Sequence, residues 1–197
     1  MSTLQKTTRL EAINSMMTSI GEAPISSLTA GSMPQDAAIA SFVLDEVNRE
    51  VQAIGWHFNR EYNVSLALDS NNKIPVATTV LSVDIPRSES ADTIVIRGDF
   101  LYNTSKQDDS DRFVFDGPIE ATVTYLLDLT ELPQPAREYI VARASRIFQE
   151  RVLGSADLSR VLASRELDAK GDLLQYETTS GNNNYLDFPG GYISRYI

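Results

Sequence analysis

The side chains that most often carry out catalysis are scarce in this sequence. Its single histidine, His57, lies between Trp56 and Phe58, and any Ser-His-Asp triad would have to use it. No serine stands in a G-x-S-x-G turn, the setting that exposes a nucleophilic serine. His57 is therefore predicted to be a packed or partly exposed structural residue, and we assign no catalytic residue.

Candidate metal and nucleotide sites are also few. Asp108, Asp109 and Asp111 resemble a calcium loop in composition, but the spacing is wrong and the turn glycine and final glutamate are missing. A solvated acidic turn is the favoured interpretation. The absence of cysteine excludes thiolate ligands and disulfides, and no glycine-rich phosphate motif occurs. The sequence thus predicts no metal and no cofactor.

Arginine is the side chain that the sequence concentrates in one place. A helix is predicted over 136–153, and at roughly 100° per residue it has one apolar arc. Arg137 and Arg151 fall inside this arc, where we expect them to cap or to snorkel. Arg143 and Arg146 fall outside it and are expected to be free to bind outward. The apolar arc consists of Ile140, Val141, Ala144, Ile147, Phe148 and Val152.

Two interpretations of these arginines remain. The first is pairing within the subunit, with acidic partners drawn from Glu138, Glu150, Asp157, Glu166 and Asp168. The second is binding across an interface, for which the planar guanidinium group is well suited. On the second interpretation, the candidate interface residues are Arg143, Arg146, Arg160 and Arg165.

The elements that must position these residues form an α+β fold. Two helices are predicted at the start, over 8–20 with a Thr8–Glu11 capping box and up to residue 54 with a Ser32–Gln35 capping box. Alternating segments predict strands over 62–68, 80–85, 93–102, 113–115 and 119–126. The helices over 136–153 and 156–176 then form an antiparallel pair. We expect a four-helix core (1–60 and 132–180), an inserted, mostly antiparallel β region (61–131) and an extended C-terminal arm (181–197).

Charge is distributed unevenly along the chain. The net charge is −10, and residues 61–131 hold 13 acidic and 5 basic side chains. This balance argues against gripping nucleic acid by its phosphates, although simple solubility would also explain it. No apolar run approaches the roughly 18 residues of a membrane span, and no signal peptide is apparent. We therefore expect no membrane partner.

The C-terminal arm combines flexible residues with large apolar ones. Glycine and asparagine are frequent in it, and a stretch of this kind becomes ordered only when it docks. We therefore predict that the arm binds a partner through Tyr185, Leu186, Phe188, Tyr192, Ile193 and Tyr196.

Several short strings, taken in order, resemble the tail tubular protein A family, the gatekeeper or head-to-tail adaptor proteins of podoviruses. The resemblance is nearly collinear from residue 10 to residue 178. The matching strings are Ser19-Ile20-Gly21-Glu22 with Pro24, Gly55-Trp56-x-Phe58-Asn59, Tyr102-x-Thr104-Ser105 leading to Asp111-Arg112-Phe113, and Ile140-Val141-x-x-Ala144-Ser145-Arg146 with Phe148.

The resemblance implies a structural virion protein in the phage tail, with no catalytic residues. It implies a dodecameric ring between the portal protein and the tail nozzle, tail tubular protein B, that docks tail fibres and forms part of the DNA ejection channel. The four candidate arginines would then contact a neighbouring subunit or the portal, and Tyr102, Arg112 and Phe113 would face the nozzle or fibre. An acidic channel wall would repel the DNA backbone, so DNA would pass without sequence-specific binding.

Two other function classes remain open. The chain could be a small soluble binding module, with exposed Tyr62, Tyr102 and Phe113 as a carbohydrate or peptide platform. More distantly, it could be a carboxylate-based hydrolase that uses the acidic region. The oligomeric state separates the ring from the binding module.

Overall fold

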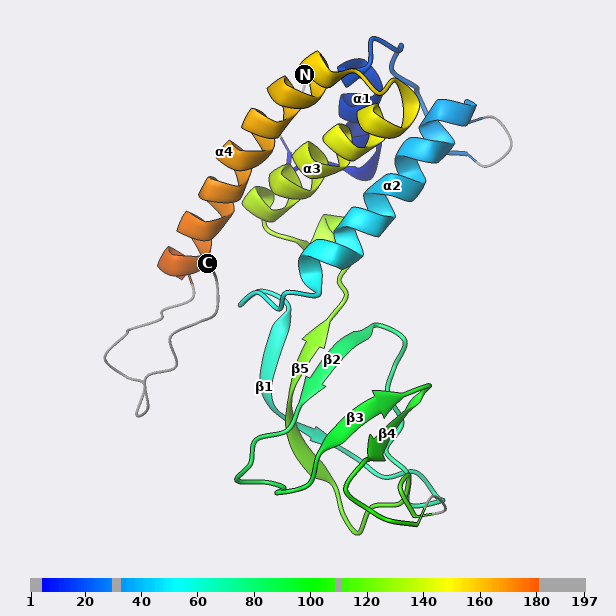
Figure 1. Ribbon diagram of the computed structural model, residues 1–197, viewed down its shortest axis with the longest axis vertical. Coiled ribbons are helices and arrows are strands. Elements are labelled where there is room, and N and C mark those ends of the chain that lie inside the picture. Colours follow the sequence, from blue (N-terminus) through cyan, green and yellow to red (C-terminus); the bar gives the residue numbers. More distant parts are fainter. Residues whose placement is uncertain (1–4, 30–32, 109–110, 181–197) are drawn as a thin grey trace.

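The fold has two parts, a helical core and a β region (Figure 1). The computed structural model describes residues 5–29, 33–108 and 111–180. Helices are α1 (Arg9–Ser19), α2 (Gln35–Gln52), α3 (Gln134–Val152) and α4 (Ala156–Ser180). Strands are β1 (Arg60–Leu66), β2 (Val80–Asp84), β3 (Ile94–Arg97), β4 (Phe100–Asn103) and β5 (Ile119–Tyr125), and the 3-10 helix η1 (Leu129–Glu131) precedes α3. The α+β prediction is confirmed.

The first two helices begin in different ways. Thr8 and Glu11 form the predicted capping box at α1, which satisfies backbone N–H groups that the first turn leaves unpaired. The capping box predicted for α2 is wrong. Pro34 occupies the N-cap position and makes no side-chain cap hydrogen bond, so Gln35 is the first helical residue rather than the third. The fixed φ angle of proline, −56° here, sets the chain direction instead.

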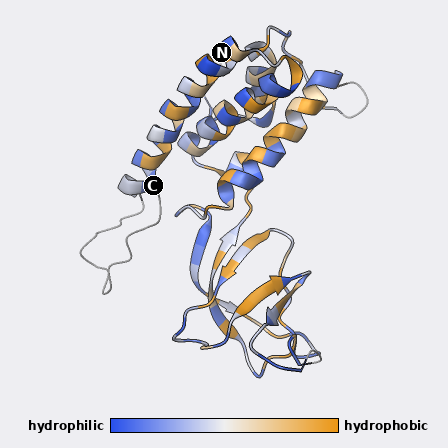
Figure 2. Cartoon of the chain, in the orientation of Figure 1, coloured by the Kyte–Doolittle hydropathy of each residue, from blue (hydrophilic) through white to orange (hydrophobic). Residues whose placement is uncertain are grey.

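The helical core is held together by one large apolar cluster. Residues from all four helices contribute to it, and α3 lies between α2 and α4 (Figure 1). Both apolar and polar residues recur along α2 and α4 (Figure 2), as expected of helices with a buried side. The largest fully buried apolar side chains of the cluster are Ile13, Met16, Leu44, Leu129, Leu132, Ile140, Phe148 and Leu173.

The β region contains two small antiparallel sheets. In the first, β5 lies between β1 and β2, and both outer strands have a register shift against β5. The shift in β1 lies between Glu61 and Val64 and includes Asn63, whose φ is +56°. The second sheet is the β3–β4 hairpin. A smaller apolar cluster, centred on Ile74, Leu101 and Phe115, packs against side chains from both sheets.

Two strand predictions are wrong in this region. The segment 93–102 is a hairpin rather than one strand, because Gly98, with φ +62°, begins a two-residue turn that pairs Arg97 with Phe100. The segment 113–115 is not a strand. Its chain turns at Asp111 and Val114, and the Phe115 side chain, only 7% exposed, enters the smaller cluster.

Buried amides join the two parts of the fold. The side chain of Gln52, fully buried at the end of α2, makes two hydrogen bonds with the backbone of Leu127, which follows β5. Its Nε2 donates to the Leu127 carbonyl at 2.9 Å, and its Oε1 accepts from the Leu127 N–H at 2.8 Å. Without these bonds, the N–H and C=O groups of Leu127 would need water or another partner. They fix the point where the returning chain enters the helical core.

The side-chain amide of Asn59 fixes the chain where it leaves α2 for β1. Asn59, 2% exposed, donates from Nδ2 to the carbonyls of Gln52 and Tyr125 at 3.0 and 2.7 Å. Its Oδ1 accepts from the Trp56 N–H at 2.8 Å. The corner between Gln52 and Asn59 favours Gly55, because φ is +79° there, a conformation that residues with a Cβ rarely adopt. We call Gln52, Asn59 and Leu127 the joint.

The joint generates a stability prediction. Gln52→Leu leaves the Leu127 N–H without its partner and leaves the Leu127 carbonyl only the 3.4 Å bond from Asn48, and an unpaired buried group costs on the order of 1–3 kcal/mol. We expect the free energy of unfolding in urea to fall by about 2 kcal/mol or more. Gln175→Leu is the matched control, because Gln175 is exposed on α4. Its effect should stay within about 0.5 kcal/mol, and equal effects of the two changes would contradict the role of the joint.

Candidate functional site

The candidate arginines Arg143 and Arg146 meet at one carboxylate. Glu166 of α4 accepts from Arg143 Nη1 at 2.9 Å and from Arg146 Nε at 2.5 Å. Its side chain is only 12% exposed, and the two arginine side chains are 23% and 24% exposed. Two charge-assisted hydrogen bonds to one carboxylate form a strong contact. They tie α4 to α3.

The same arginines extend this contact in both directions. Arg143 also pairs with Glu50 of α2, and Arg146 also pairs with Glu150 at 2.9 Å. Glu150 in turn accepts from the Ser159 hydroxyl of α4 at 2.7 Å. We call this set the arginine ladder, with members Glu50, Arg143, Glu166, Arg146 and Glu150. It crosses three helices on one surface of the core.

The neighbours of Glu166 and Glu150 in the ladder stabilise the charged form of these carboxylates. Burial acts to raise the pKa of Glu166, but the hydrogen bonds from Arg146 and Arg143 outweigh burial and hold its pKa below 4.5. Glu150 also has a lowered pKa, because it accepts from Ser159 and Arg146. Both carboxylates are therefore ionised at neutral pH.

The expectation that Arg143 and Arg146 are free to bind outward is wrong, since both are paired within the subunit. The first interpretation correctly included Glu150 and Glu166 as partners. It missed Glu50, which lies 93 residues from Arg143 in sequence. Helical spacing reveals only partners on the same or the next helix, so a partner on α2 carried no local signal.

Arg137 and Arg151 lie at opposite ends of α3 and differ in burial. Arg137 is 3% exposed and donates to the carbonyls of Leu132 (2.8 Å), Thr7 (2.7 Å) and Thr130. Arg137 therefore neither snorkels to solvent nor caps its own helix, and it binds carbonyls of η1, of the residue after η1 and of the segment before α1. Arg151 instead forms a bidentate pair with Glu46 of α2, at 2.8 and 2.9 Å.

The remaining candidate arginines lie on the surface of α4. Arg160 contacts Asp157 at 3.3 Å, but both side chains are at least 80% exposed, so the pair contributes little. Arg165 is exposed beside a groove of about 480 Å³ between α1, α3 and α4. Among the residues that the structure describes, none forms an ion pair with Arg165.

The three residues expected to face a nozzle or fibre come together in the β region. The rings of Tyr102 and Phe113 are 4.9 Å apart, and Arg112 Nη1 donates to the Tyr102 hydroxyl at 2.8 Å. The guanidinium of Arg97 lies 3.7 Å above the Tyr102 ring. Tyr102 is only 4% exposed, so it supports this surface rather than forming it.

The alternative ligand platform is not formed as predicted. Tyr102 is buried, contrary to the expectation, because two arginines and Phe113 enclose its ring. Tyr62 is 65% exposed, but it lies on β1 in the other sheet. The three aromatic residues therefore do not make one exposed face.

His57 attaches the end of α4 to the corner after α2. Its backbone N–H donates to Glu177 Oε1 at 2.9 Å, and its Nδ1 contacts the other carboxylate oxygen. The Tyr176 ring lies 5.3 Å from the imidazole. Glu177 lies 120 residues away in sequence, so the sequence did not reveal this partner.

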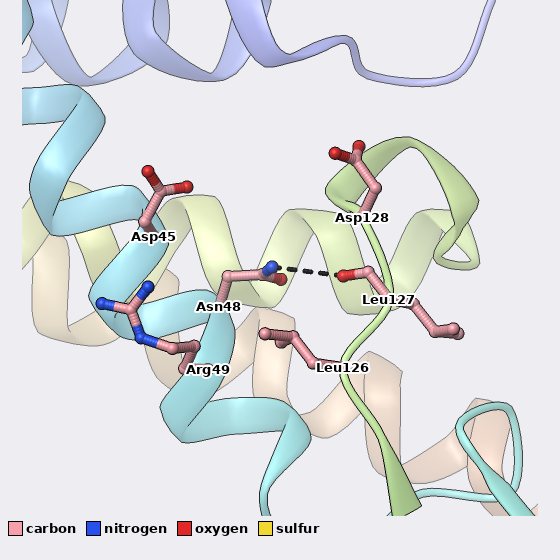
Figure 3. A pocket seen from close by; sticks show the side chains of 6 residues that line it. All are labelled: Asp45, Asn48, Arg49, Leu126, Leu127 and Asp128. Atoms are coloured by element: carbon pink, nitrogen blue, oxygen red, sulfur yellow. Dashed lines mark hydrogen bonds between the residues drawn. The ribbon is translucent and has the colours of Figure 1, made fainter. Parts of the chain in front are cut away.

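A shallow hollow lies beside the joint (Figure 3). It has a volume of about 260 Å³ and is lined by Asp45, Asn48 and Arg49 of α2 and by residues 126–128 after β5. Asn48 donates across it to the Leu127 carbonyl at 3.4 Å. Within the described ranges, no cluster of acidic or histidine residues suits a metal ion, and no helix there is long and apolar enough to span a membrane.

Three sets of predicted residues lie outside the described residues. The first is Ser32 of the second predicted capping box, and the second is Asp109 of the acidic turn. The third is the proposed docking set of the C-terminal arm, which consists of Tyr185, Leu186, Phe188, Tyr192, Ile193 and Tyr196.

The arginine ladder generates a pH-dependent prediction. Glu166→Gln should lower the free energy of unfolding at pH 7 by about 1–3 kcal/mol, the usual contribution of hydrogen bonds to a charged group. Because folding lowers the pKa of Glu166, its stabilising effect is present above its ordinary pKa and is lost as the pH falls through the lowered value. The difference between wild type and variant should therefore shrink in acid.

Urea unfolding followed from about pH 7 to about pH 3 measures this difference. Glu89→Gln is the control, since Glu89 is exposed in a loop of the β region. A Glu166→Gln difference that stayed constant across the pH range would show that packing, not ionisation, is responsible.

Comparison with known proteins identifies the family of the chain. No curated protein matches the sequence. Residues 10–183 match the family described as "Tail tubular protein", and this range includes both sheets and all four described helices except Arg9, the first residue of α1. The chain therefore belongs to the tail tubular protein family and is a structural protein of the phage tail.

Proposed function

We propose that the chain is one subunit of a closed, dodecameric adaptor ring between the portal protein and the tail nozzle. The observation that carries this proposal is the exposure of large apolar side chains on α4. Leu167 is 70% and Leu174 46% exposed, although Leu162 and Leu173 of the same helix are buried in the core. A helix with apolar residues on both sides is normally covered on both.

A ring also needs subunits that keep their shape. The arginine ladder links α2, α3 and α4, and Arg9 ties α1 to α2 through Asp45 at 2.6 Å. His57 attaches the far end of α4 to the corner above the β region. These contacts hold the outer surfaces of the core in fixed relative positions, which supports repeated docking of identical copies.

The β region has the charge expected of a channel wall. It contains 13 acidic and 5 basic side chains, and Glu61, Asp84, Asp99 and Glu120 are among the exposed ones. Such a surface repels DNA phosphates, because they find few cations to pair with. We therefore propose that DNA passes this region without sequence-specific binding during ejection.

Contacts to other virion proteins follow from the remaining surfaces. Arg160 and Arg165, with Arg143 and Arg146 through their exposed edges, are proposed to contact a neighbouring subunit or the portal. Arg112 and Phe113 are proposed to face the nozzle, tail tubular protein B, or a tail fibre. The C-terminal arm is proposed to dock onto one of these partners.

The binding-module alternative has less support. Its platform required three exposed aromatic residues, and Tyr102 is buried. Family membership also favours a structural role over an enzymatic one.

The mass of the purified protein tests the ring. We expect mass photometry and negative-stain electron microscopy to show closed rings, alone or after addition of the portal protein. These rings should form without any added ligand. A stable monomer both alone and with portal and nozzle would contradict the proposal and favour the binding module.

Charge reversal at Arg165 tests its proposed contact. Because no described residue pairs with Arg165, Arg165→Glu should change the free energy of unfolding by no more than about 0.5 kcal/mol. It should nevertheless weaken ring or portal association severalfold in titrations of assembled mass. Arg87→Glu makes the same charge change at an exposed site in the β region, and equal association by both variants would exclude Arg165 from the interface.

A further inference from the structure

We infer that neighbouring subunits dock head to tail, with the outer face of α4 in one copy against the outer face of α2 in the next. This inference rests on the proposed ring and names the two surfaces that build it. Both surfaces lie entirely within the described residues.

The α4 outer face is a continuous strip. Its residues recur every three or four positions and therefore share one side of the helix. Leu167 and Leu174 provide its apolar centre, and Leu162 and Leu173 point the other way into the core. All members of the strip are exposed: Arg160, Ala163, Leu167, Lys170 and Leu174.

The α2 outer face is a second strip with one dominant apolar residue. Phe42 is 62% exposed, whereas Val43, Leu44 and Val47 of the same helix are fully buried. Small or polar residues at helical spacing surround Phe42, so its ring stands out from the surface. The members of the strip are Ala38, Phe42, Glu46, Arg49 and Ala53.

The two strips lie on opposite flanks of the subunit, since α2 and α4 flank α3 (Figure 1). A contact between two different patches on opposite flanks leaves one patch of each type free on every dimer. Further copies can add in the same way until the ring closes. A single self-complementary patch would stop at a dimer.

Phe42 and Leu167 also lie at similar heights along the helical core. Both helices run toward the β region, because α2 leads into β1 and the end of α4 contacts His57. Phe42 precedes Gln52 of the joint by ten residues, and Leu167 precedes Glu177 by ten. At about 1.5 Å per residue, Phe42 lies roughly 15 Å along its helix from Gln52, and Leu167 lies roughly 15 Å along its helix from Glu177, the partner of His57. Rotation about an axis parallel to these helices preserves that height, so it brings the two side chains together.

Charge favours this pairing over contact between two α4 helices. The α4 outer face carries Arg160 and Lys170 and no carboxylate. The α2 outer face holds one carboxylate, Glu46, and one cation, Arg49, and Asp45 and Glu50 lie beside it on α2. The side chains of Asp45, Glu46 and Glu50 are 42%, 42% and 55% exposed. Each already binds an arginine of its own subunit, but a carboxylate has further acceptor sites. Two α4 faces together would instead place four cations around one apolar patch.

Cysteine cross-linking tests the contact, because the natural chain has no cysteine. Phe42→Cys and Leu167→Cys both replace exposed side chains, so the subunit fold should tolerate them. We expect the double variant to give a ladder of disulfide-linked oligomers after mild oxidation. A mixture of the two single variants should give only linked dimers, and each single variant alone only monomers.

Val161→Cys combined with Phe42→Cys is the matched control. Val161 is 61% exposed on α4 but lies outside the α4 outer face, so this pair should link at least tenfold more slowly. Equal linking of test and control pairs would overturn the inference, as would rapid dimers of Leu167→Cys alone.

The head-to-tail contact and the closed ring can be contradicted by different results. Rings seen by electron microscopy without cross-links in the double variant would overturn the head-to-tail contact and leave the ring intact. A ladder in open filaments would support the contact and overturn the closed ring. Wild-type protein without rings, together with a double variant without a ladder, would overturn both.

Discussion

The fold depends on two buried side-chain amides that pair the backbone groups where the chain crosses between the helical core and the β region. Gln52 binds both backbone groups of Leu127, and Asn59 binds the carbonyls of Gln52 on the outgoing chain and of Tyr125 on the returning chain. Unsatisfied backbone groups at this depth would destabilise both parts together. Because the two amides lie side by side, the direction in which the β region leaves the core is set by hydrogen bonds rather than by a flexible linker.

Arginine gives the core its rigidity. One carboxylate, Glu166, serves two guanidinium groups, and these reach carboxylates on α2 and α3. The surplus of positive charge on α3 is therefore largely neutralised inside the subunit. Among the described basic residues of α4, Arg165 and Lys170 form no ion pair, and the exposed Leu167 and Leu174 lie on the same helix. The subunit thus separates the side chains that maintain its shape from those available to a partner.

Local patterns predicted local structure well. The capping box of Thr8 and Glu11, the helical periodicity and the turn glycines all correspond to features of the fold. Long-range partners were not predictable, because Glu50, Glu46 and Glu177 reach their partners across 93, 105 and 120 residues. The burial of Tyr102 was missed for another reason, because its partners Arg97, Arg112 and Phe113 are near in sequence but come together only when the loop after β4 folds back. Helical spacing places a residue on a face but does not show whether another element covers it.

The irregular outer strands of the first sheet direct how copies of this chain can meet. A regular edge strand presents unpaired N–H and C=O groups that recruit other chains into larger sheets. Here β1 is interrupted at Asn63 and β2 between Val80 and Ser82, and such bulges twist an edge away from strand addition. These two irregular edges are therefore poor templates for the addition of a strand from another chain.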